Sequence, residues 1–305
     1  MSFHRTLIIG YGSIGRRHER LLRHLDLQTA VVSGQKVDAI SYPTIVSALD
    51  DWHPDYVVVA SPTSRHARDF AEIRLAGFKG TILVEKPVVA NPSEIIEDHM
   101  RLTYVGYNLR FLPAIAHLRE LVSGQQVHTV GIWNAQYLPE WRPGRDYRTT
   151  SSASLKAGGG VLRDLSHDLD FVDFLFGKVT SVFGLIGKYG SLEIDTEDTA
   201  QLVMSSERCR SISIYLSYLD RQAKHAIRLT TSDDSIECNL LTGELQINGR
   251  SECFSKERDE TFLAMHRAII GNDTRSLCTL EDAMRTVRVI DASELSARER
   301  RIVAL

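Results

Sequence analysis

Apolar and polar positions in the first third of the chain alternate between two patterns. Short, mostly apolar runs such as residues 6–10 and 56–61 are typical of strands that are buried on both faces of a sheet. Between these runs, apolar residues recur at three- and four-residue spacing, which indicates helices. We expect strands at 6–10, 29–33, 56–61, 81–87 and 103–108, and helices at 14–25, 44–51, 66–77 and around 93–100. This alternation predicts an α/β fold in which helices cover both faces of a doubly wound parallel sheet, as in Rossmann-like domains.

The pattern changes after about residue 125. In residues 211–219, Ile212, Ile214 and Leu216 alternate with small or polar residues, which predicts antiparallel strands with one face packed on helices. Further strands are expected at 131–138, 181–187, 199–206, 226–231, 235–240 and 244–249, and helices at 257–271 and 281–300. We therefore expect residues 1–108 to form the Rossmann-like domain and residues 109–305 to form an α+β domain with a large open, mainly antiparallel sheet.

Composition excludes several classes of protein. The chain has 305 residues and a net charge of -3, and it lacks a basic stripe, so we expect no nucleic-acid partner. No apolar run approaches the length of a membrane helix or a signal sequence, and we expect a cytoplasmic protein without a membrane partner. The four cysteines form no C-x-x-C pair, which favours reduced thiols and predicts no metal site.

A glycine-rich stretch follows the first expected strand. Gly10, Gly12 and Gly15 form a G-x-G-x-x-G motif, with Ser13 and Ile14 inside it, at the start of an expected helix. Such glycines allow a tight turn, a close approach of pyrophosphate to the backbone and close packing of helix on strand. The first N–H groups of the helix then face the anion, so this segment predicts dinucleotide binding.

The end of the second strand bears on the kind of dinucleotide. An acidic residue that would hold the adenosine ribose is missing there, and the chain continues instead through Ser33 to Lys36. These two residues, with Arg16 or Arg17, could hold a 2′-phosphate, which favours NADP slightly over NAD. The alternative is that Lys36 and both arginines are solvated surface charges.

Ser61, Pro62 and Thr63 end the expected strand at 56–61, and His66 follows them. Because strand carboxyl ends line the cofactor crevice in this architecture, all four are candidate cofactor contacts. Thr63 also suits a helix N-cap, and we prefer packing in the first helical turn to a catalytic role for His66.

Glu85 and Lys86 end the next strand and precede Pro87. A lysine at the end of a buried strand needs a partner or a substrate, and a cis Pro87 would fix its direction. Both residues are candidate cofactor contacts, and Lys86 is also a candidate substrate contact. The alternative is an ordinary surface loop.

Three glycines at 158–160 lead into an expected helix that carries Asp164 and His167. Residues three apart share a helix face, so the pair can converge, and a carboxylate fixes the orientation of a histidine for proton transfer. We expect Asp168 and Asp170 to be a solvated acid and a structural partner. Alternatively, the acids only favour the positive end of the helix dipole.

Two loop segments are candidate substrate contacts. Asn108 and Arg110 follow the last strand of the first domain, at the domain junction. A later loop combines arginines, which suit carboxylates or phosphates, with aromatic rings, which stack on sugars. Its candidates are Trp141, Arg142, Arg145, Tyr147 and Arg148. The alternative is a surface loop whose arginines pair with Asp146 and Glu140.

The order of these motifs resembles the glucose–fructose oxidoreductase/inositol dehydrogenase (Gfo/Idh/MocA) family. The resemblance rests on the glycine motif, A-S-P-T-x-x-H, E-K-P, GYNLRF and the glycine-led Asp/His helix. It implies an NAD(P)-dependent oxidoreductase, in which hydride moves between nicotinamide and a hydroxyl or carbonyl carbon of a sugar, sugar acid or sugar nucleotide. It also implies a homodimer or homotetramer formed through the C-terminal sheet.

By position, the resemblance implies catalytic roles for Lys86, Asp164 and His167. His167 would take the proton and also contact the substrate, Lys86 would stabilise charge on oxygen, and Asp164 would orient both. The family more often spaces its Asp and His four apart, whereas here they are three apart. Two alternatives stay open: a non-catalytic, cofactor-bound regulatory protein, and a reductase of a non-sugar substrate, as among biliverdin reductase relatives.

Overall fold

The chain forms two compact units. The computed structural model describes residues 3–35, 37–90, 93–94, 96, 98 and 100–305. One unit comprises Met1–Phe111 and Glu257–Met284, and the other comprises Leu112–Lys256 and Arg285–Leu305. The first unit thus includes a segment that the sequence assigned to the C-terminal domain. None of the helices in the described ranges combines the length and the apolar composition of a membrane span.

A seven-stranded sheet, sheet A, forms the centre of the first unit. Its strands, in spatial order, are β3 (Ser41–Tyr42), β2 (Gln28–Val32), β1 (Arg5–Ile9), β4 (Tyr56–Val59), β5 (Thr81–Val84), β6 (Thr103–Val105) and β15 (Cys278–Thr279). The first six are parallel and follow the Rossmann order, whereas β15 joins β6 antiparallel. The predicted doubly wound parallel sheet is confirmed.

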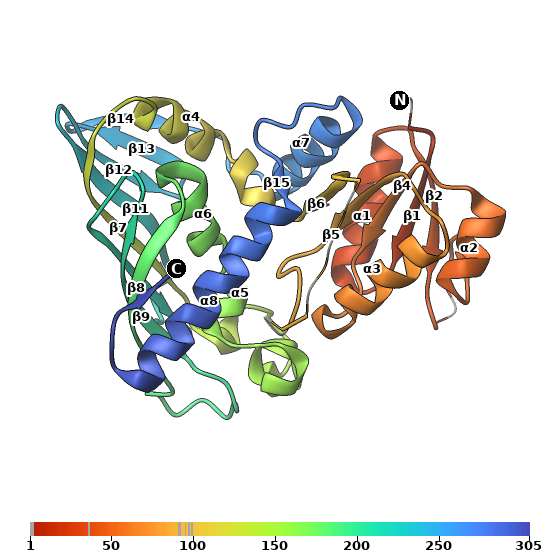
Figure 1. The fold of residues 1–305 in the computed structure, drawn as a ribbon, viewed down its shortest axis with the longest axis horizontal. Coiled ribbons are helices and arrows are strands. Elements are labelled where there is room, and N and C mark those ends of the chain that lie inside the picture. The colour runs from red at the N-terminus through yellow and green to blue at the C-terminus, as the bar shows by residue number, and fades with distance from the viewer. Residues whose placement is uncertain (1–2, 36, 91–92, 95, 97, 99) are drawn as a thin grey trace. The chain divides into compact units, whose positions relative to one another are not determined.

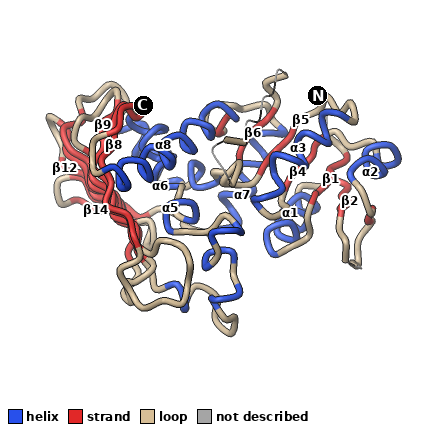
Figure 2. Tube along the Cα trace, turned by 60° about the horizontal axis from the view of Figure 1, so that its bottom comes forward, coloured by secondary structure: helices blue, strands red, loops and turns tan. Residues whose placement is uncertain are grey.

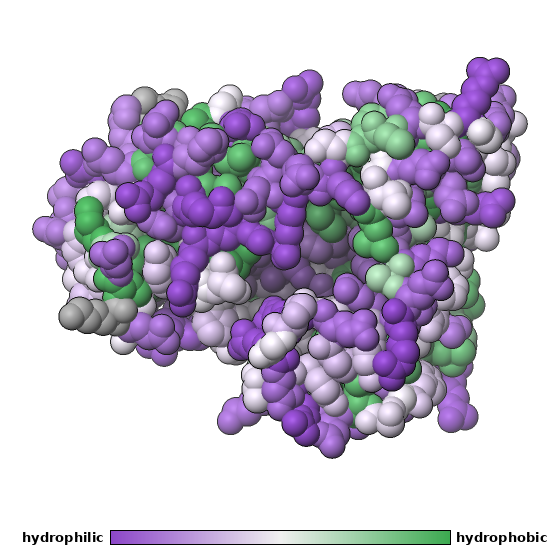
Figure 3. All heavy atoms as spheres, turned by 180° about the vertical axis from the view of Figure 1, so that it is seen from behind, coloured by the Kyte–Doolittle hydropathy of each residue, from purple (hydrophilic) through white to green (hydrophobic). Residues whose placement is uncertain are grey.

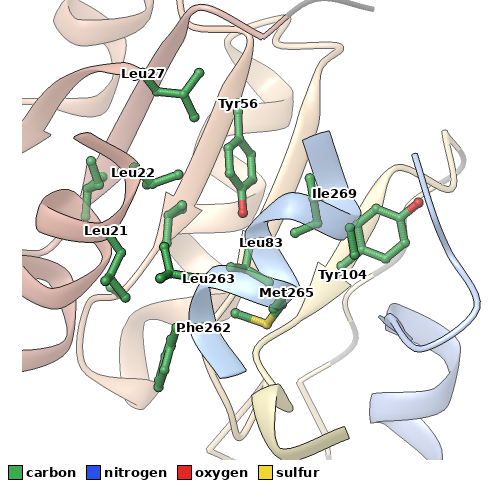
Figure 4. Close-up of a cluster of buried hydrophobic side chains, with 14 of the residues drawn as sticks. Leu21, Leu22, Leu27, Tyr56, Leu83, Tyr104, Phe262, Leu263, Met265 and Ile269 are labelled. Carbon is green, nitrogen blue, oxygen red and sulfur yellow. The ribbon is translucent and has the colours of Figure 1, made fainter. Parts of the chain in front are cut away.

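Helices pack on sheet A in two pairs. Helix α1 (Ser13–His24) packs beside α7 (Arg258–Ile270), and α2 (Ile45–Trp52) packs beside α3 (His66–Leu75; Figure 1). Figure 4 shows the core below the first pair, where leucines of α1 and apolar side chains of α7 meet strand residues. The helix expected around residues 93–100 lies partly outside the described residues, and the described ones among them are not helical.

A nine-stranded sheet, sheet B, forms the second unit. Its strands, in spatial order, are β14 (Arg250–Cys253), β13 (Glu244–Ile247), β12 (Ser235–Asn239), β11 (Lys224–Thr231), β7 (Val127–Ala135), β10 (Ile212–Ser217), β9 (Thr199–Ser206), β8 (Val179–Gly187) and β16 (Val303–Ala304). All neighbours are antiparallel except β7 and β10. The predicted open, mainly antiparallel sheet is confirmed, and Ile212, Ile214 and Leu216 are its buried face in β10.

Helices cover one face of sheet B. Figure 2 shows α6 (His167–Phe176) and α8 (Leu280–Glu299) on the same side of its strands. The unit also contains the short α5 (Val161–Asp164) and α4 (Pro113–Val122), and α4 was not expected from the sequence. Polar side chains predominate on the molecular face drawn in Figure 3, where hydrophobic residues form separate small patches. On sheet B, by contrast, Trp133, Leu185 and Val203 are 39%, 53% and 60% exposed.

Candidate active site

The glycine motif forms a turn between β1 and α1. Gly10 has a φ of +91°, and a Cβ there would lie 2.6 Å from the Cα of Ser61 at the end of β4. A Cβ on Gly15 would lie 2.1 Å from the carbonyl oxygen of Gly10. These two glycines therefore let the turn, the helix and β4 pack closely.

Gly12 has a different surrounding. It is the N-cap of α1 with extended backbone angles, and a Cβ there would meet no atom within 4 Å. The next two residues, Ser13 and Ile14, begin α1, and the first N–H groups of a helix have no intrahelical acceptors. Nearby at the end of β4, the Ser61 hydroxyl is buried without a hydrogen-bond partner in the described part of the chain. An open space at a helix start beside an unsatisfied hydroxyl fits the pyrophosphate of a dinucleotide.

The residues that were expected to hold a 2′-phosphate near the carboxyl end of β2 mostly contact other protein groups. The Ser33 hydroxyl accepts a hydrogen bond from the backbone of Gln35 at 3.1 Å, and Lys36 lies outside the described residues. Arg16 donates to the carbonyl of Tyr11 and lies over its ring. Arg17 instead pairs with Asp259 and lies over the ring of Phe262, both from the α7 segment.

His66 connects two backbone turns. Its ring nitrogens lie 2.9 Å from the carbonyl oxygen of Ser61 and 3.0 Å from that of Pro87. Burial lowers the pKa of His66, while the two backbone hydrogen bonds oppose this effect. The side chain thereby ties the carboxyl end of β4 to the turn after β5. Pro62 and Thr63 lie in the intervening turn, and Thr63 is not an N-cap, since Pro62 and Arg65 occupy the cap positions there.

Glu85 and Lys86 lie directly after β5. The Glu85 side chain is 8% exposed, and its carboxylate accepts the backbone N–H of Lys86 at 3.2 Å. The Lys86–Pro87 bond is cis, as the sequence analysis considered. Lys86 is half-buried at the strand end.

The side chains of Asn108 and Arg110 bind other residues of the first unit. The Asn108 amide donates to the Thr261 hydroxyl at 2.6 Å, and Arg110 is 3% exposed and pairs with Asp282 at 3.3 Å. Both bonds fix the returning segment 257–284. These contacts give both residues a structural role within the first unit, and their predicted contact with substrate stays a prediction.

Asp164 and His167 lie on two consecutive helices rather than on one. α5 ends at Asp164 and α6 begins at His167, with Leu165 and Ser166 between them. Gly158 and Gly160 before α5 have φ values of +77° and +117°, backbone angles that glycine adopts far more readily than other residues. The expectation of one shared helix face was wrong, because the helix breaks between the two residues.

Tyr218 is a site residue that the sequence analysis missed. Its fully buried hydroxyl donates to the Asp164 carboxylate at 2.7 Å. Burial, and then the Asp164 charge, raise the pKa of Tyr218 well above its usual range, so the phenol stays protonated. Tyr218 follows directly after β10 and continues the alternation of Ile212, Ile214 and Leu216, which agrees with its burial. A buried tyrosine needs a hydrogen-bond partner, but spacing alone could not identify Asp164 as that partner.

Asp168 is not the solvated acid that we expected. It is fully buried, and its carboxylate lies 2.9 Å from His225 and accepts the amide of Asn134 at 2.7 Å. Asp170 is also fully buried. Asp168 therefore anchors α6 to β7 and β11 of sheet B.

The arginine-rich loop divides into two groups. Arg148 pairs with Asp146 at 2.9 Å and with Glu193 at 2.7 Å, so it forms surface ion pairs, though with Glu193 rather than Glu140. The remaining candidates line one small cavity, whose walls are Leu138, Trp141, Arg142, Arg145, Tyr147, Thr150 and Ser152.

This cavity adjoins the Asp164 cluster. Trp141 packs edge-on against the ring of Tyr218, with ring centroids 5.2 Å apart. The guanidinium groups of Arg142 and Arg145 are exposed. The second unit thus brings cationic, aromatic and carboxylate side chains together.

Two family models match the chain. One, described as the oxidoreductase family with an NAD-binding Rossmann fold, matches residues 4–102, and the other, the GFO/IDH/MocA C-terminal domain, matches residues 115–237. The chain belongs to the GFO/IDH/MocA family of oxidoreductases. The first unit is accordingly an NAD-binding Rossmann domain, and the resemblance stated from the sequence is confirmed. A search of curated proteins gave no match to this sequence.

Several solved structures share the fold. GenD2 from gentamicin A biosynthesis, in complex with NAD, aligns with a TM-score of 0.81 at 20% identity, over 100% of this chain and 97% of that one. The WlbA dehydrogenase from Bordetella pertussis, in complex with NADH and UDP-GlcNAcA, gives 0.79 at 16% identity, over 99% of each chain. Levoglucosan dehydrogenase, in complex with NADH and levoglucosan, gives 0.85 at 16% identity, also over 99% of each. At these identities the likeness establishes the fold only.

Proposed function

We propose that this oxidoreductase acts on a carbohydrate derivative that carries a negative charge, such as a sugar acid or a sugar nucleotide. The observation that supports this class is the cluster of loop side chains in which Arg142 and Arg145 lie with Trp141, next to Tyr218 and Asp164. Guanidinium groups suit carboxylates and phosphates, and an aromatic ring can pack on the apolar face of a sugar. The bound UDP-GlcNAcA of WlbA belongs to the same chemical class.

The proposed chemistry assigns one role to each polar side chain. When bound, the nicotinamide supplies or accepts the hydride. His167 takes the proton of the substrate hydroxyl during oxidation and returns it to the carbonyl oxygen during reduction. Lys86 stabilises the negative charge that develops on that oxygen. Asp164, held by the Tyr218 hydroxyl, orients the imidazole and the substrate.

For the cofactor, we propose a preference for NADP. This preference is supported by the sequence after β2, because residues 33–36 include no aspartate or glutamate. A carboxylate there would hold the ribose of NAD and repel a 2′-phosphate. Gly10, Gly12, Gly15 and the α1 N-terminus would hold the pyrophosphate in either case.

We also propose that a second copy of the chain covers the open face of sheet B. Trp133, Leu185 and Val203 line one broad hollow on this face together with Lys224 and Glu237. The hollow is largely apolar but has charges of both signs, as expected of a surface that meets an identical one.

A substrate screen with two arginine variants tests the proposal. Purified protein is incubated with oxidised and reduced NAD and NADP, and turnover is followed at the nicotinamide absorbance with neutral sugars, sugar acids and sugar nucleotides. Replacing Arg142 and Arg145 together by alanine should raise KM for a charged substrate at least about tenfold, since hydrogen bonds to charged groups contribute about 1.5–3 kcal/mol. Arg301→Ala is the matched control, because the Arg301 guanidinium makes local contacts with Glu299 and with the carbonyl of the adjoining Ile302. Efficient turnover of neutral sugars alone would contradict the proposed substrate class.

A further inference from the structure

A chain of four polar side chains runs through the interior of the first unit. The Tyr56 hydroxyl lies 3.0 Å from Nδ1 of His266, and Nε2 of His266 lies 2.9 Å from Nδ1 of His18. Nε2 of His18 in turn lies 2.9 Å from the Glu85 carboxylate. Tyr56, His18 and His266 are each 0% exposed. Figure 4 shows the Tyr56 hydroxyl directed toward α7, the helix that carries His266.

The chemistry of its two ends gives this chain one direction. Burial raises the pKa of Tyr56 well above its usual range, so the tyrosine end keeps its hydroxyl proton and can donate it to Nδ1 of His266. Burial and the neighbouring His18 lower the pKa of His266 well below its usual range, so that ring is neutral. His266 therefore accepts at Nδ1 and donates from Nε2. His18 then accepts at Nδ1 and donates from Nε2 to the Glu85 carboxylate, which satisfies each buried donor and acceptor in turn.

The carboxylate end of the chain meets the strand end that carries Lys86. One Glu85 oxygen receives the His18 bond and the other accepts the Lys86 backbone N–H at 3.2 Å. The carboxylate also packs against Gly106, where a Cβ would lie only 2.8 Å from it. Glu85 is thus fixed from three sides. Its own orientation fixes the backbone position from which the Lys86 side chain extends.

We propose that His18 and His266 are positioning residues, which hold Glu85 and through it the Lys86 backbone in a single orientation. The chain starts from β4, crosses α7 and α1, and ends after β5, so it joins four elements of the first unit by side-chain hydrogen bonds. Its importance for catalysis rests on the proposed role of Lys86. The hydrogen-bond chain itself stands independently of that role.

Nuclear magnetic resonance of the full-length protein, labelled with ¹⁵N-histidine and ¹⁵N-lysine, tests the chain directly. His18 and His266 should each show a protonated Nε2 and an unprotonated Nδ1 at neutral pH. The Lys86 backbone amide provides a second signal, because its hydrogen bond depends on Glu85. Resonances are assigned by substitution. A doubly protonated ring at either position, or the opposite tautomer at His18, would overturn the proposed direction.

Two variants of His266 distinguish a role in positioning Glu85 from a role in filling space in the core. His266→Phe fills the same space but cannot donate to His18, whereas His266→Gln keeps a donor. In His266→Phe we expect mixed tautomers at His18, a shifted Lys86 amide and a turnover reduced about 10- to 100-fold, the scale of a 1 Å misplacement. His266→Gln should restore the His18 tautomer and turnover to within about threefold, and dinucleotide affinity should stay within twofold throughout. His24→Phe, on the exposed end of α1, is the control.

The results of these experiments distinguish a failure of the positioning role from a failure of the proposed function. If His266→Phe leaves the His18 tautomer and the Lys86 amide unchanged, the positioning role is wrong whatever the protein catalyses. If both signals change while turnover does not, His266 holds Glu85 and the Lys86 backbone as proposed, and it is the catalytic role of Lys86 that is wrong. If no charged carbohydrate is turned over by the unmodified protein, the proposed substrate is wrong. The two labelled signals still decide in that case whether His266 holds Glu85 and Lys86.

Discussion

Gly12 and Gly15 belong to one motif, but we expect alanine to have different effects at the two positions. At Gly12 it should weaken dinucleotide binding, and at Gly15 it should lower the free energy of unfolding. Gly12 has φ -74° and ψ -164°, angles open to any residue, and its added methyl would meet no protein atom within 4 Å. Gly→Ala stabilises by about 0.4–1 kcal/mol through the unfolded chain, while alanine is a poorer N-cap than glycine by a similar amount. We therefore expect Gly12→Ala to change the free energy of unfolding by less than about 1 kcal/mol.

The same methyl would occupy the space that we assign to the pyrophosphate. A dinucleotide at 100 times its Kd stabilises a protein by about 2.7 kcal/mol, and a 100-fold loss of affinity reduces this to about 0.4 kcal/mol. Gly12→Ala should therefore remain folded but lose most of the stabilisation by NAD(H) or NADP(H). Gly15→Ala, whose methyl would lie 2.1 Å from the Gly10 carbonyl oxygen, should instead lose about 3 kcal/mol without any ligand.

Denaturant titration with and without dinucleotide measures both quantities. Gly131→Ala is the control, because Gly131 lies in sheet B and its added Cβ would make only ordinary contacts, the nearest at 3.7 Å. If Gly12→Ala retained the full stabilisation by dinucleotide, the ligand would not lie over the start of α1. If it were as unstable as Gly15→Ala, the open space above Gly12 would be wrong.

Three further outcomes follow from the structure. Lys86→Ala should lower turnover about 10²- to 10³-fold while dinucleotide Kd changes less than twofold, and normal turnover would remove Lys86 from the mechanism. Burial raises the pKa of Glu197 to about 7, so its contribution to the free energy of unfolding is present at low pH and lost as pH rises from about 4.5 to 7. Glu197→Gln should thus gain about 3 kcal/mol at pH 8 but little at pH 4 in denaturant titrations, and equal gains at both would contradict this. Trp133→Glu should reduce the mass found by light scattering to that of one chain, whereas Tyr189→Glu, which is exposed away from that hollow, should not.

Much of each sheet could be predicted because burial alone determines the pattern of its strands. The central strands of sheet A are largely apolar, since helices cover both of its faces. β10 alternates, since only one face of sheet B is covered by helices. The same patterns predicted α7 as a helix at the correct residues but assigned it to the C-terminal domain, whereas it belongs to the first unit. Periodicity reports that a face is buried and does not report which distant surface buries it.

Side-chain partners were the least predictable part of the candidate site. Of the arginines near residue 145, Arg148 is taken by Glu193, which lies 45 positions further along the chain. Asp168 looked like a solvated helix acid, yet it meets His225 and Asn134 of sheet B. Asp164 depends on Tyr218, 54 positions away. Such pairs arise from tertiary packing, for which local spacing carries no signal.

The first unit is built from two segments that are far apart in the sequence, and this affects the folding of the nascent chain. Residues up to Phe111 leave the ribosome well before the segment Glu257–Met284 that supplies α7 and β15. At 5–20 residues per second the delay amounts to about 10–30 s. During that interval the leucines of α1 and the edge of β6 lack their final cover, and His18 lacks His266. Translation speed and chaperone capture should therefore govern the yield of this half of the molecule more strongly than that of an uninterrupted one.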